Sequence, residues 1–583
     1  MRILATILGT AALFLLLPRT AAAAPPVLKR GSLSPFVREA TDMGPLPLSR
    51  TQQVVVGLAL RNRDQLEAFL ADVQDPASPN YRRFLTQEEF NARFAPVPED
   101  EQAVAAYLEQ NGLTVARRFP NRLLIDARGS VAAIERAFGV RLHAVRFRGK
   151  SRFAALREPA LPVPVASMVT GVLGLDDLNE MVPHVRGRRA VVAPHAAVGA
   201  DCCHLSPNDL RTFYNNTTGL DGSGQTVVIA GAYAWKDSDN TAFNTEWSLP
   251  ALPAGSGQVC TGSGSPGGCQ YSSLNSIEIA LDVEYAHGTA PGATILNYMA
   301  ASTSFSNFTV MYNRIVTDDP GHVVSTSWGA CESVISESAQ QTNDDIFANG
   351  NAIGQSWFAA SGDNGSRDCD DVPSVDHPAN SPHVIGVGGT TPTCSGGMTT
   401  SDPACAGYGS ETGWSDSGGG VSTIFSRPSF QTGCGVPSGS ERLVPDVSLD
   451  ADTSPGVYVI TDGSWISLGG TSGATPQWAG YLAMRNQLAG GSGLGNPGAL
   501  LYALCGTAAY HDITTGSNGD YTAGAGYDLV TGLGTIDAAA FLSGSQNIPT
   551  LSWKGAAVLA LLILGAFAVA LPRRRRPGSV ESS

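Results

Sequence analysis

The chain has 583 residues, of which 43% are hydrophobic and only 15% are charged. This length exceeds the usual size of one domain, about 100–200 residues, and the apolar content is enough for sizeable cores. The 66 glycines and 36 prolines indicate many turns, but the glycines follow no three-residue period. The composition therefore excludes a collagen-like fibre and a long coiled coil.

Charge is distributed unevenly along the chain. Residues 25–200 contain 23 Lys and Arg against 18 Asp and Glu, whereas residues 201–547 contain 7 Lys and Arg against 32 Asp and Glu. A body this acidic repels phosphate, which argues against nucleic acid as a partner. We expect the first part, at net +5, to attract the second, at net −25. The acidic body also suits acidic surroundings, where carboxylates lose their charge.

Residues 1–24 have the features of a secretory signal peptide. Arg2 precedes an apolar run at residues 3–17, and Ala22-Ala23-Ala24 offers small residues for cleavage. We therefore expect an exported protein, extracellular or at the cell surface, in which disulfide bonds are permitted.

Residues 25–185 are predicted to form a separate small α+β domain. Three of its segments are strand-like: 52–60, 122–126 and 141–147. Three others show helical periodicity: 63–73, 99–111 and 131–138. Short helices against a few antiparallel strands suggest a ferredoxin-like sandwich. Residues 148–200 lack clear periodicity and include Arg186-Gly187-Arg188-Arg189, so residues 186–204 are predicted to be a linker in which the chain is cut.

Residues 205–545 combine buried strand patterns with helical stretches. The strand candidates are 225–232, 293–299, 323–328, 356–360, 383–388 and 457–461. The helical candidates are 275–287, 334–349 and 475–488. This alternation predicts an α/β fold, a parallel sheet with helices on both faces. Ligands of such sheets bind beyond the carboxyl ends of the strands, where Ser327-Trp328-Gly329 and Ser361-Gly362-Asp363 fall.

All ten cysteines lie between Cys202 and Cys505, and no two CxxC motifs show zinc spacing. Proximity in sequence makes three pairs plausible: Cys260–Cys269, Cys331–Cys369 and Cys394–Cys405. The sequence alone does not determine the connectivity.

Glu278 and Asp282 lie four residues apart in a predicted helix. This spacing places both carboxylates on one face, where they repel each other, so we expect a raised pKa and a shared proton. A solvated acidic face is the simpler interpretation of the spacing alone. The flanking residues, such as Ile277 and Leu281, are nevertheless apolar.

Two turns rich in small residues carry further candidates. Residues 469–476 place Ser472 between a strand-like run and a helix. The positive end of the helix dipole there favours a developing anion. Asp363 follows a strand within residues 359–365. A glycine-rich turn with an N-capping serine and an ordinary Asx-turn are the structural alternatives for these two segments.

Near the end of the body, Asp512-Ile513-Thr514 and residues 524–528 combine two carboxylates with several turn carbonyls. A hard cation such as Ca²⁺ takes six to eight oxygen ligands of these kinds. The spacing is not that of an EF-hand, and an ordinary turn is also compatible with it.

Residues 546–583 are predicted to be a C-terminal sorting tail. The apolar run at 555–571 is at the short limit for a transmembrane helix, and the cluster Arg573–Arg576 keeps the chain end cytoplasmic and the body outside. Ile548-Pro549-Thr550-Leu551 resembles the start of the IPTL-type sorting tails of Gram-negative bacteria. We expect at least transient membrane anchoring and contact with sorting machinery; a plain membrane anchor is the alternative.

In this order, the motifs resemble those of the sedolisins, or serine-carboxyl peptidases, including kumamolisin-like enzymes. The match runs over about residues 205–540, and residues 50–180 resemble the activation prodomain of that family. The resemblance implies a subtilisin-like fold and a serine endopeptidase that acts on proteins or peptides. It also implies an inactive precursor, inhibited by its own prodomain and matured by its removal, and we expect a monomer.

The resemblance assigns a catalytic role to four residues. It makes Ser472 the nucleophile, Glu278 its general base and Asp282 the group that orients Glu278. Asp363 takes the role of the oxyanion-hole acid. Gly473 departs from the family, which usually has Ala there, and is expected to loosen the start of the helix.

The resemblance also implies one structural Ca²⁺ ion and no other cofactor. Its ligands are the carboxylates of Asp512 and Asp528 and backbone oxygens of Ile513, Gly524 and Gly526.

These residue types suit catalysis in acid. A histidine base, with an ordinary pKa of about 6.5, is protonated near pH 4, whereas a glutamate, at about 4.3, still accepts the serine proton. A protonated Asp363 donates a hydrogen bond to the oxyanion, whereas an ionised one repels it. We therefore predict activity that peaks at about pH 3–5.

Three other interpretations remain open. His287-Gly288-Thr289 echoes the histidine motif of subtilisin-type peptidases, although His287 lies at the wrong end of its predicted helix. Glycosidases also use two carboxylates, but that function leaves Ser472 and the prodomain unexplained. A non-catalytic cell-surface protein keeps the tail and the disulfides without requiring all four motifs.

Overall fold

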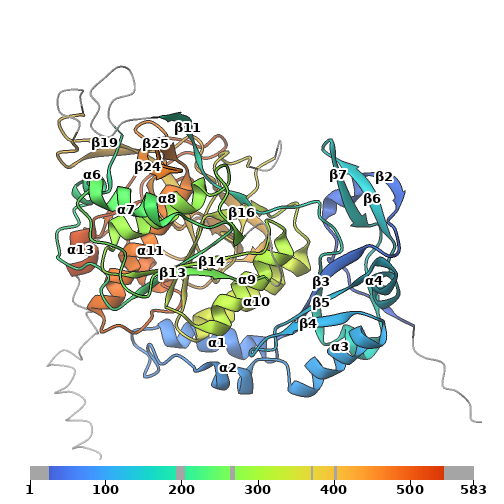
Figure 1. Cartoon of the computed structure of the whole chain (residues 1–583). Helices are drawn as coiled ribbons and strands as arrows, with labels where there is room; N and C mark the ends of the chain where they lie inside the picture. Colours follow the sequence, from blue (N-terminus) through green and yellow to red (C-terminus); the bar gives the residue numbers. More distant parts are fainter. Residues whose placement is uncertain (1–24, 192–203, 263–268, 369–371, 399–403, 544–583) are drawn as a thin grey trace, which may run out of the picture.

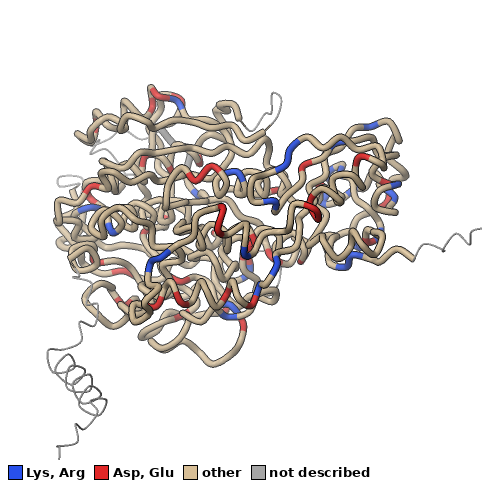
Figure 2. The backbone as a smooth tube through the Cα atoms, turned by 90° about the horizontal axis from the view of Figure 1, so that it is seen from below, with Lys and Arg blue, Asp and Glu red and all other residues tan. Residues whose placement is uncertain are grey.

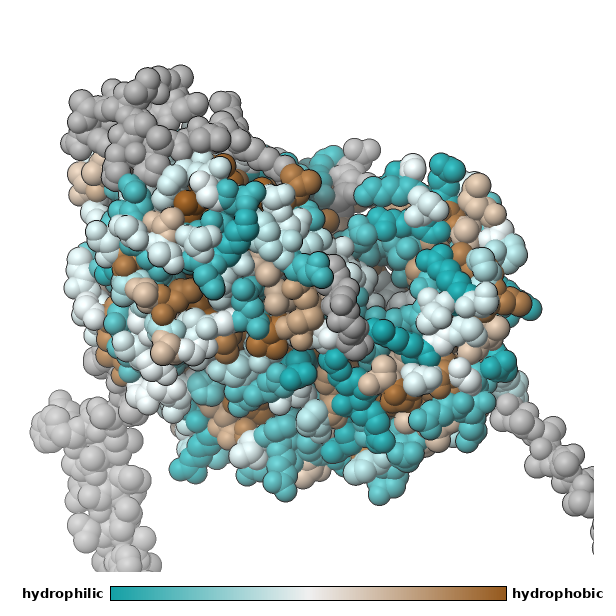
Figure 3. All heavy atoms as spheres, viewed as in Figure 1, coloured by the Kyte–Doolittle hydropathy of each residue, from teal (hydrophilic) through white to brown (hydrophobic). Residues whose placement is uncertain are grey.

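The computed structural model describes residues 25–191, 204–262, 269–368, 372–398 and 404–543. Within these ranges no helix is long and apolar enough to cross a membrane. The predicted signal peptide, most of the predicted linker and the predicted sorting tail with its helix at 555–571 lie outside the described residues. Apolar residues on the face seen in Figure 3 form small patches among hydrophilic ones.

A four-stranded antiparallel sheet organises the N-terminal domain, residues 25–185 (Figure 1). Its strand order is β4 (Thr114–Arg118), β5 (Leu124–Ser130), β3 (Thr51–Leu58) and β9 (Val169–Leu173). The helices between β3 and β4 are α1 (Arg63–Gln74), α2 (Gln87–Arg93) and α3 (Pro98–Gln110), and α4 (Val131–Phe138) follows β5. This order and connectivity give the ferredoxin-like arrangement that the sequence predicts.

The segment after residue 148 is more regular than the sequence predicts. It contains β9 and four further strands: β7 (Lys150–Ala155), β8 (Ala160–Leu161), β10 (Val182–Pro183) and β11 (Arg186–Val191). The strands β8 and β10 have two residues each, too few for a period of two to stand out. The main partners of β9, β10 and β11 also lie more than 100 residues away in sequence. Residues 186–191, at the start of the predicted linker, therefore form a strand that pairs with the body.

The body contains the predicted sheet, with eight strands. Seven follow in the order β13 (Gly257–Cys260), β14 (Thr294–Met299), β12 (Thr226–Gly231), β15 (Val323–Thr326), β17 (Ser356–Ala360), β19 (Ile385–Cys394) and β20 (Tyr408–Gly413). The eighth, β23 (Val447–Asp450), pairs with β19, and only β20 runs antiparallel to its neighbour. This confirms the predicted α/β class.

One predicted strand of this sheet belongs elsewhere. The segment 457–461 is indeed a strand, β24 (Val457–Thr461), but it forms a hairpin with β25 (Ser464–Gly469). The other neighbour of β25 is β11, so the hairpin and the segment after the N-terminal domain share a three-stranded sheet.

Alternation along β12 explains why helices cover both faces of the main sheet. Val227 and Ile229 join one apolar core, whereas Val228 and Ala230 join the other, because successive side chains of a strand point to opposite faces. The first core contains residues of α8 (Ile277–Thr289) and α11 (Thr471–Leu488), and the second contains residues of α9 (Phe305–Asp318) and α10 (Glu337–Ala352).

The N-terminal domain packs on the outer side of α9 and α10 and shares the second core. Val55 of β3 joins that core, while Val54 and Val56 join a third one with α3 and α4. Gly57 and its cross-strand partner Gly171 leave room for α10, since a Cβ atom on Gly57 would lie 2.6 Å from Thr342 Oγ1. The two parts are therefore held by a continuous apolar core.

Ion pairs complete this interface, and Figure 2 marks the charged residues along the backbone. Arg63 of α1 contacts Asp345 and lies 2.6 Å from Asp344, both on α10, and Asp344 also lies 2.8 Å from His383 Nδ1. Glu67 lies 3.3 Å from His383 Nε2. Opposite charges therefore meet where the basic and acidic parts of the chain join.

The pKa shifts of these groups show how the interface responds to acid. Although burial opposes it, the charges of His383 and Arg63 hold the pKa of Asp344 well below its usual range. The contribution of Asp344 is therefore present above the usual aspartate pKa and is lost only in stronger acid. Burial raises the pKa of Asp345 to about 6, so its ionisation weakens the interface as pH rises. The two aspartates of this interface therefore respond to acid in opposite directions.

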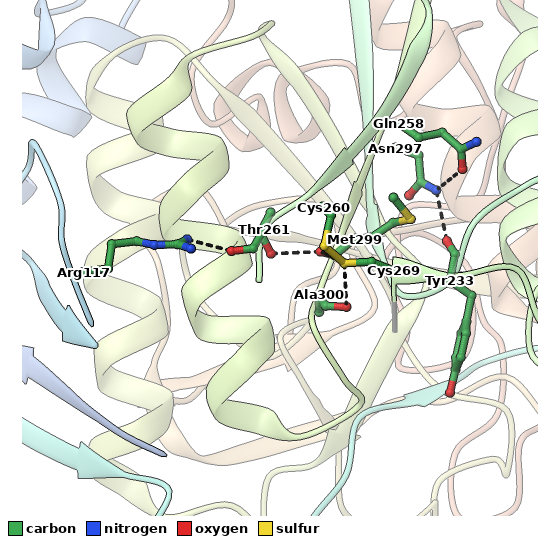
Figure 4. The surroundings of a disulfide bond; sticks show 9 residues. All are labelled: Arg117, Tyr233, Gln258, Cys260, Thr261, Cys269, Asn297, Met299 and Ala300. Atoms are coloured by element: carbon green, nitrogen blue, oxygen red, sulfur yellow. Dashed lines mark hydrogen bonds between the residues drawn. A yellow bond between two sulfur atoms is a disulfide. The ribbon is translucent and has the colours of Figure 1, made fainter. Parts of the chain in front are cut away.

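Disulfide bonds hold loops of the body. Within the described residues the pairs are Cys260–Cys269, Cys394–Cys405 and Cys434–Cys505. The first two were predicted, whereas the third joins residues 71 apart, too far for an argument from proximity. Cys369, the predicted partner of Cys331, lies outside the described residues. Beside Cys260–Cys269, Arg117 of β4 donates to the carbonyl of Thr261 at 2.6 Å, a further contact between domain and body (Figure 4).

Substituting Arg63→Ala is expected to loosen the N-terminal domain, because it leaves Asp344 and Asp345 without their arginine. The Arg63 side chain is 36% exposed and partly screened, so the loss is about 1–2 kcal/mol, less than for a fully buried pair. Hydrogen exchange of α10 and β3 in the full chain measures it. Arg83→Ala, at an exposed arginine, is the control, and equal protection in the two variants contradicts the assignment.

Candidate active site

Glu278 and Asp282 lie one turn apart on α8, which is buried along its whole length. Their exposed fractions are 1% and 0%, which excludes the solvated acidic face. Burial and the charge of Asp282 raise the pKa of Glu278 well above its usual range, and burial raises the pKa of Asp282 to about 8. The Ser327 hydroxyl donates to Asp282 Oδ1 at 2.5 Å and lowers the pKa of Asp282. The structure therefore contains the predicted buried pair.

Ser472 is the second residue of α11, which starts four residues earlier than its predicted range. Its hydroxyl lies 3.4 Å from the carbonyl oxygen of Ser327 and faces Glu278, whose pKa it lowers. Neither carboxyl oxygen of Glu278 has a hydrogen bond of good geometry among the described residues. The Glu278 carboxyl thus has acceptor capacity left for the Ser472 proton.

Asp363 follows β17 and lies beside the start of α11. Its Oδ1 accepts two hydrogen bonds from Thr471, from the backbone N–H and the hydroxyl, both at 2.8 Å. Its Oδ2 is buried without a hydrogen bond from the described residues. Burial raises the pKa of Asp363 to about 7, so in acid this carboxyl is a neutral hydrogen-bond donor.

The topology of the sheet explains why these distant residues meet. Ser327 directly follows β15, and Asp363 lies three residues after β17, the parallel neighbour of β15. The carboxyl ends of both strands therefore lie at one edge, as expected for a ligand site. The helices α8 and α11 pack against each other (Figure 1). The first turn of each carries a site residue, Glu278 on α8 and Ser472 on α11, and the two side chains face each other.

The segment that leaves the N-terminal domain fills this site. It pairs antiparallel with β16 (Trp328–Cys331) through β10, and with β25 through β11. Between the two pairings, His184 N–H donates to Ser327 O and Ser472 N–H donates to His184 O, both at 3.0 Å. Two cavities, of ≈ 580 and ≈ 530 Å³, lie next to the segment. Asp363 lines the first and Glu278 lines the second. The chain thus occupies its own cleft.

Gly470 makes this close approach possible. Its φ of 107° lies in the left-handed region that favours glycine. A Cβ atom there would collide with the carbonyl oxygen of His184 and would lie 2.6 Å from Asp363 Oδ2. The His184 carbonyl and the unpaired Asp363 oxygen therefore face the same small space.

Gly473, where the resemblance predicts a looser helix start, has a helical backbone. A Cβ atom on it would meet only Asp450 O, at 3.9 Å, so the position has room for alanine.

The predicted calcium ligands lie around one loop. Gly526 N–H donates to both carboxyl oxygens of Asp512 at 3.1 Å, and Gly524 N–H donates to Asp528 Oδ2 at 3.0 Å. Among the described residues, none donates to the carbonyl oxygens of Ile513, Gly524 or Gly526. Two carboxylates and three available carbonyls form an all-oxygen donor set, which fits Ca²⁺.

His287 lies away from the catalytic group. It is in the last turn of α8, nine residues after Glu278, which is about 13 Å along the helix axis. Its Nε2 lies 2.8 Å from the carbonyl oxygen of Pro250, and burial lowers the pKa of the imidazole. The structure therefore gives His287 a structural partner and no contact with Ser472.

Comparison with known proteins agrees with this geometry. Residues 38–178 match the family "Pro-kumamolisin, activation domain", and residues 256–526 match the "Subtilase family". The chain is 32% identical to sedolisin from Pseudomonas sp. (strain 101) over 534 residues, which cover 86% of this chain and 88% of that protein. The chain belongs to the sedolisin family. It is therefore a serine-type peptidase with an activation prodomain, which the family match places at residues 38–178.

Two further relatives support this assignment. Kumamolisin from Bacillus sp. (strain MN-32) is 32% identical over 85% of this chain and 92% of that protein. The structure of Pseudomonas sedolisin, solved in complex with two molecules of pseudo-iodotyrostatin, superposes with a TM-score of 0.53 and 29% identity. It covers 59% of this chain and 98% of that one. A subtilisin-like fold preceded by a prodomain is thus shown.

Sequence reasoning missed some residues of the site. Ser327 falls at a predicted strand end, but nothing in the sequence assigns its hydroxyl to Asp282. Thr471 precedes the predicted nucleophile, yet its two hydrogen bonds to Asp363 depend on the fold. His184 gave no signal, because its place in the cleft results from two strand pairings over more than 100 residues.

Substituting Ser327→Ala is expected to lower kcat by about tenfold to a hundredfold and to move the acid limb of the rate profile to higher pH. The reason is that the lost hydroxyl stabilises ionised Asp282, so without it the carboxyl pair gives up its proton at higher pH. Rate–pH profiles of the matured variant and of Ser333→Ala measure the shift. An unmoved acid limb in Ser327→Ala contradicts this role.

Proposed function

We propose that the chain is an exported, acid-active serine-carboxyl endopeptidase that cuts peptide bonds through an acyl-enzyme on Ser472. The observation that carries this proposal is the buried group of Ser472, Glu278 and Asp282. Asp363 lies beside it, hydrogen-bonded to Thr471, the residue before the nucleophile. The family establishes the serine peptidase; the role of each residue and the acidic conditions are our inference.

In the proposed reaction, Ser472 Oγ attacks the carbonyl carbon of the scissile bond and its proton passes to Glu278. Asp282 shares one proton and one charge with Glu278, and the Ser327 hydroxyl donates a hydrogen bond to Asp282. The backbone N–H of Ser472 and a protonated Asp363 stabilise the oxyanion. Glu278 then gives its proton to the leaving amine, and water releases the acyl group by the reverse sequence.

The carboxyl groups restrict this chemistry to acid. Glu278 must have lost a proton to act as a base, whereas Asp363 must have kept its proton to act as a donor. In the covered cleft, burial and the charge of Asp282 raise the pKa of Glu278 and so disfavour the ionised form that acts as the base. Water that enters after the segment leaves lowers the pKa of both carboxyls of the pair, because desolvation is the largest cause of their shifts.

The prodomain inhibits by occupation of the cleft. The contact that carries this inference is the hydrogen bond from Ser472 N–H to His184 O, which uses the donor that the oxyanion needs. Inhibition ends only when the segment has been cut and has left the cleft.

Ca²⁺ is proposed to bind at Asp512, Ile513, Gly524, Gly526 and Asp528. When bound, it supplies positive charge that offsets the repulsion of the two carboxylates and fixes the loop. Export follows from the predicted signal peptide, and attachment through residues 546–583 remains part of the proposal.

The rate profile of the matured protein is expected to be bell-shaped, with a peak at about pH 3–5. Rate rises with pH as the Glu278–Asp282 pair loses one proton and falls as Asp363 ionises, so the limbs report coupled pKa values. Ser472→Ala and Glu278→Ala are each expected to lower kcat by two to three decades or more, as expected for a loss of roughly 3–4 kcal/mol. Asp363→Asn should keep some activity and lose much of the alkaline fall.

Peptide hydrolysis with a chromogenic substrate at pH 3–9 measures these effects, with His287→Ala as the comparison. An optimum near pH 8, with full activity in Glu278→Ala and none in His287→Ala, contradicts the mechanism and favours a subtilisin-type one.

Chelator is expected to lower the melting temperature of the wild-type protein, because an ion that binds only the folded state stabilises it. Asp512→Ala and Asp528→Ala should melt lower without chelator and respond little to it. Differential scanning fluorimetry with EDTA, and with Ca²⁺ restored, tests this without reference to activity. An unchanged melting temperature of the wild type in EDTA contradicts the proposed Ca²⁺ site.

A further inference from the structure

Three loops meet beside the start of α11. The first, named here the Asp363 loop, is residues 361–366; the second, named the support turn, is residues 416–418; and the third is residues 516–523. No helix or strand of the described chain includes these residues. The position of each loop therefore depends on hydrogen bonds to the other two.

The support turn holds the backbone on both sides of Asp363. Gly418 N–H donates to Gly362 O at 2.8 Å, and Gly365 N–H donates to Asp416 O at 2.9 Å. One point before the carboxyl-bearing residue and one point after it are thus fixed to the same turn. A shift of the support turn therefore moves Asp363 with it.

Asn518, in the third loop, is bound to both of the other loops. Its carbonyl oxygen accepts a hydrogen bond from Ser366 N–H at 2.9 Å. Its side-chain amide donates to Ser417 O at 2.9 Å and to Leu529 O at 3.3 Å. Because Asn518 is only 3% exposed, the two carbonyls lose a buried donor when the amide is removed, and a buried polar group left without its partner is costly.

Two glycines allow the loops to approach Asn518 closely. Gly365 has a φ of 70°, in the left-handed region, and a Cβ atom on it would lie 2.5 Å from Asn518 O. A Cβ atom on Gly419, next to the support turn, would lie 3.2 Å from Asn518 Nδ2 and would collide with Leu529 O. The amide of Asn518 therefore lies in a closely packed junction between the loops.

Asp520 ties the third loop to the Asp363 loop nearer the surface. Its carboxylate accepts from the Ser366 hydroxyl at 2.7 Å and from the Arg367 guanidinium through two hydrogen bonds at 2.8 Å. Its N–H donates to Ser366 Oγ at 3.0 Å. The side chains of Arg367 and Asp520 are 52% and 28% exposed, so water screens this pair and it holds the loop less firmly than the buried amide does.

The position of the Asp363 loop determines how well Asp363 keeps its proton. Asp363 is 3% exposed, and burial is the largest cause that raises its pKa to about 7. A loop that moves away from the support turn admits water to this carboxyl. Water stabilises the ionised form, so the pKa of Asp363 falls towards its ordinary value.

Four charged or titratable groups face Asp363 from the surrounding elements. His184 and Arg186 belong to the segment that leaves with the prodomain. Asp368 follows the Asp363 loop, and Glu278 lies on α8. The last two remain in the matured protein and are the same in every variant below. A difference in the pKa of Asp363 between those variants therefore reports its hydration.

We propose that Asn518 is a positioning residue for catalysis: it holds the Asp363 loop against the support turn and so keeps Asp363 buried beside the oxyanion, with Asp520 as a second and weaker support. This inference rests on the proposed role of Asp363. Asn518 acts through the backbone of Ser366 and through the support turn, not through contact with the reacting atoms.

The first test compares matured Asn518→Ala with the matured wild type. We expect kcat and kcat/KM to fall together by about tenfold, and the alkaline limb of the kcat profile to move to lower pH by about half a unit or more. Rates are measured in excess Ca²⁺, because Asn518 lies between the proposed ligands Ile513 and Gly524 in sequence. An alkaline limb that stays in place overturns the proposal, however far the melting temperature falls.

Asn496→Ala is the matched control. Asn496 is 5% exposed and its side-chain amide donates to Pro382 O at 3.0 Å, so this variant also loses a buried amide between loops. The neighbouring Gly495 O accepts from the hydroxyl of Ser356, the first residue of β17, whereas Asp363 follows the last residue of that strand. The control therefore lies at the opposite edge of the sheet. It should melt lower than the wild type and keep the wild-type alkaline limb.

The second test combines Asn518→Ala with Asp363→Asn. An asparagine at position 363 does not titrate, so the double variant has little alkaline fall left to move. Its profile should have the same shape as that of Asp363→Asn alone. A clear shift of the limb between these two variants shows that Asn518 acts by a route that bypasses Asp363, and overturns the proposal.

The outcomes separate this inference from the function beneath it. A wild-type profile without an alkaline limb, or an Asp363→Asn variant that keeps the full limb, contradicts the proposed role of Asp363 and this inference with it. If both behave as proposed and Asn518→Ala leaves the limb unmoved, the peptidase mechanism stands and only the positioning role fails. Should Asn518→Ala not fold, Asp520→Asn decides, because its side chain is partly exposed; an unmoved alkaline limb in that variant overturns the proposal.

Discussion

Burying two carboxyl groups on one turn of a helix is the constraint on which the rest of this molecule depends. Neither Glu278 nor Asp282 reaches water, and each disfavours the charge of the other, so at most one is ionised at low cost. Burying such a pair lowers the stability of the fold, and we interpret the pair as serving proton transfer. Around that proton lie the hydroxyls of Ser327 and Ser472 and the start of α11. The order of β15 and β17 brings these groups together.

Features that are local in the sequence agree best with the structure. The buried strand β12, the helix that carries Glu278 and the spacing of Glu278 and Asp282 are local features, and the sequence predicts them. Ser472 and Asp363 are also found from local turns rich in small residues, because a strand end and a helix start need few residues. The sequence does not reveal the pairing of β10 with β16 or of β11 with β25, since β10 has only two residues and the partners of both strands lie far along the chain. The partner of Cys434 was missed for the same reason.

The uneven charge along the sequence correctly predicted that the two parts of the chain attract each other. The basic prodomain does meet the acidic body at Arg63, Asp344 and Asp345. Counting charges does not, however, reveal the sign of the pH response, because burial and neighbouring charges shift the pKa of Asp344 and Asp345 in opposite directions. Opposite net charges identified the partners, and only the local environment of each carboxyl determines what acid does to them.

The shared core has a consequence for the lifetime of the protein. The helices α9 and α10 form one core with the main sheet and the prodomain sheet, so the body folds against a layer that it later loses. The mature body no longer has the prodomain surface against which α9 and α10 pack. Once it unfolds, that surface is missing for refolding. We therefore expect the lifetime of the mature protein to be set by how slowly it unfolds, and its denaturation to be irreversible.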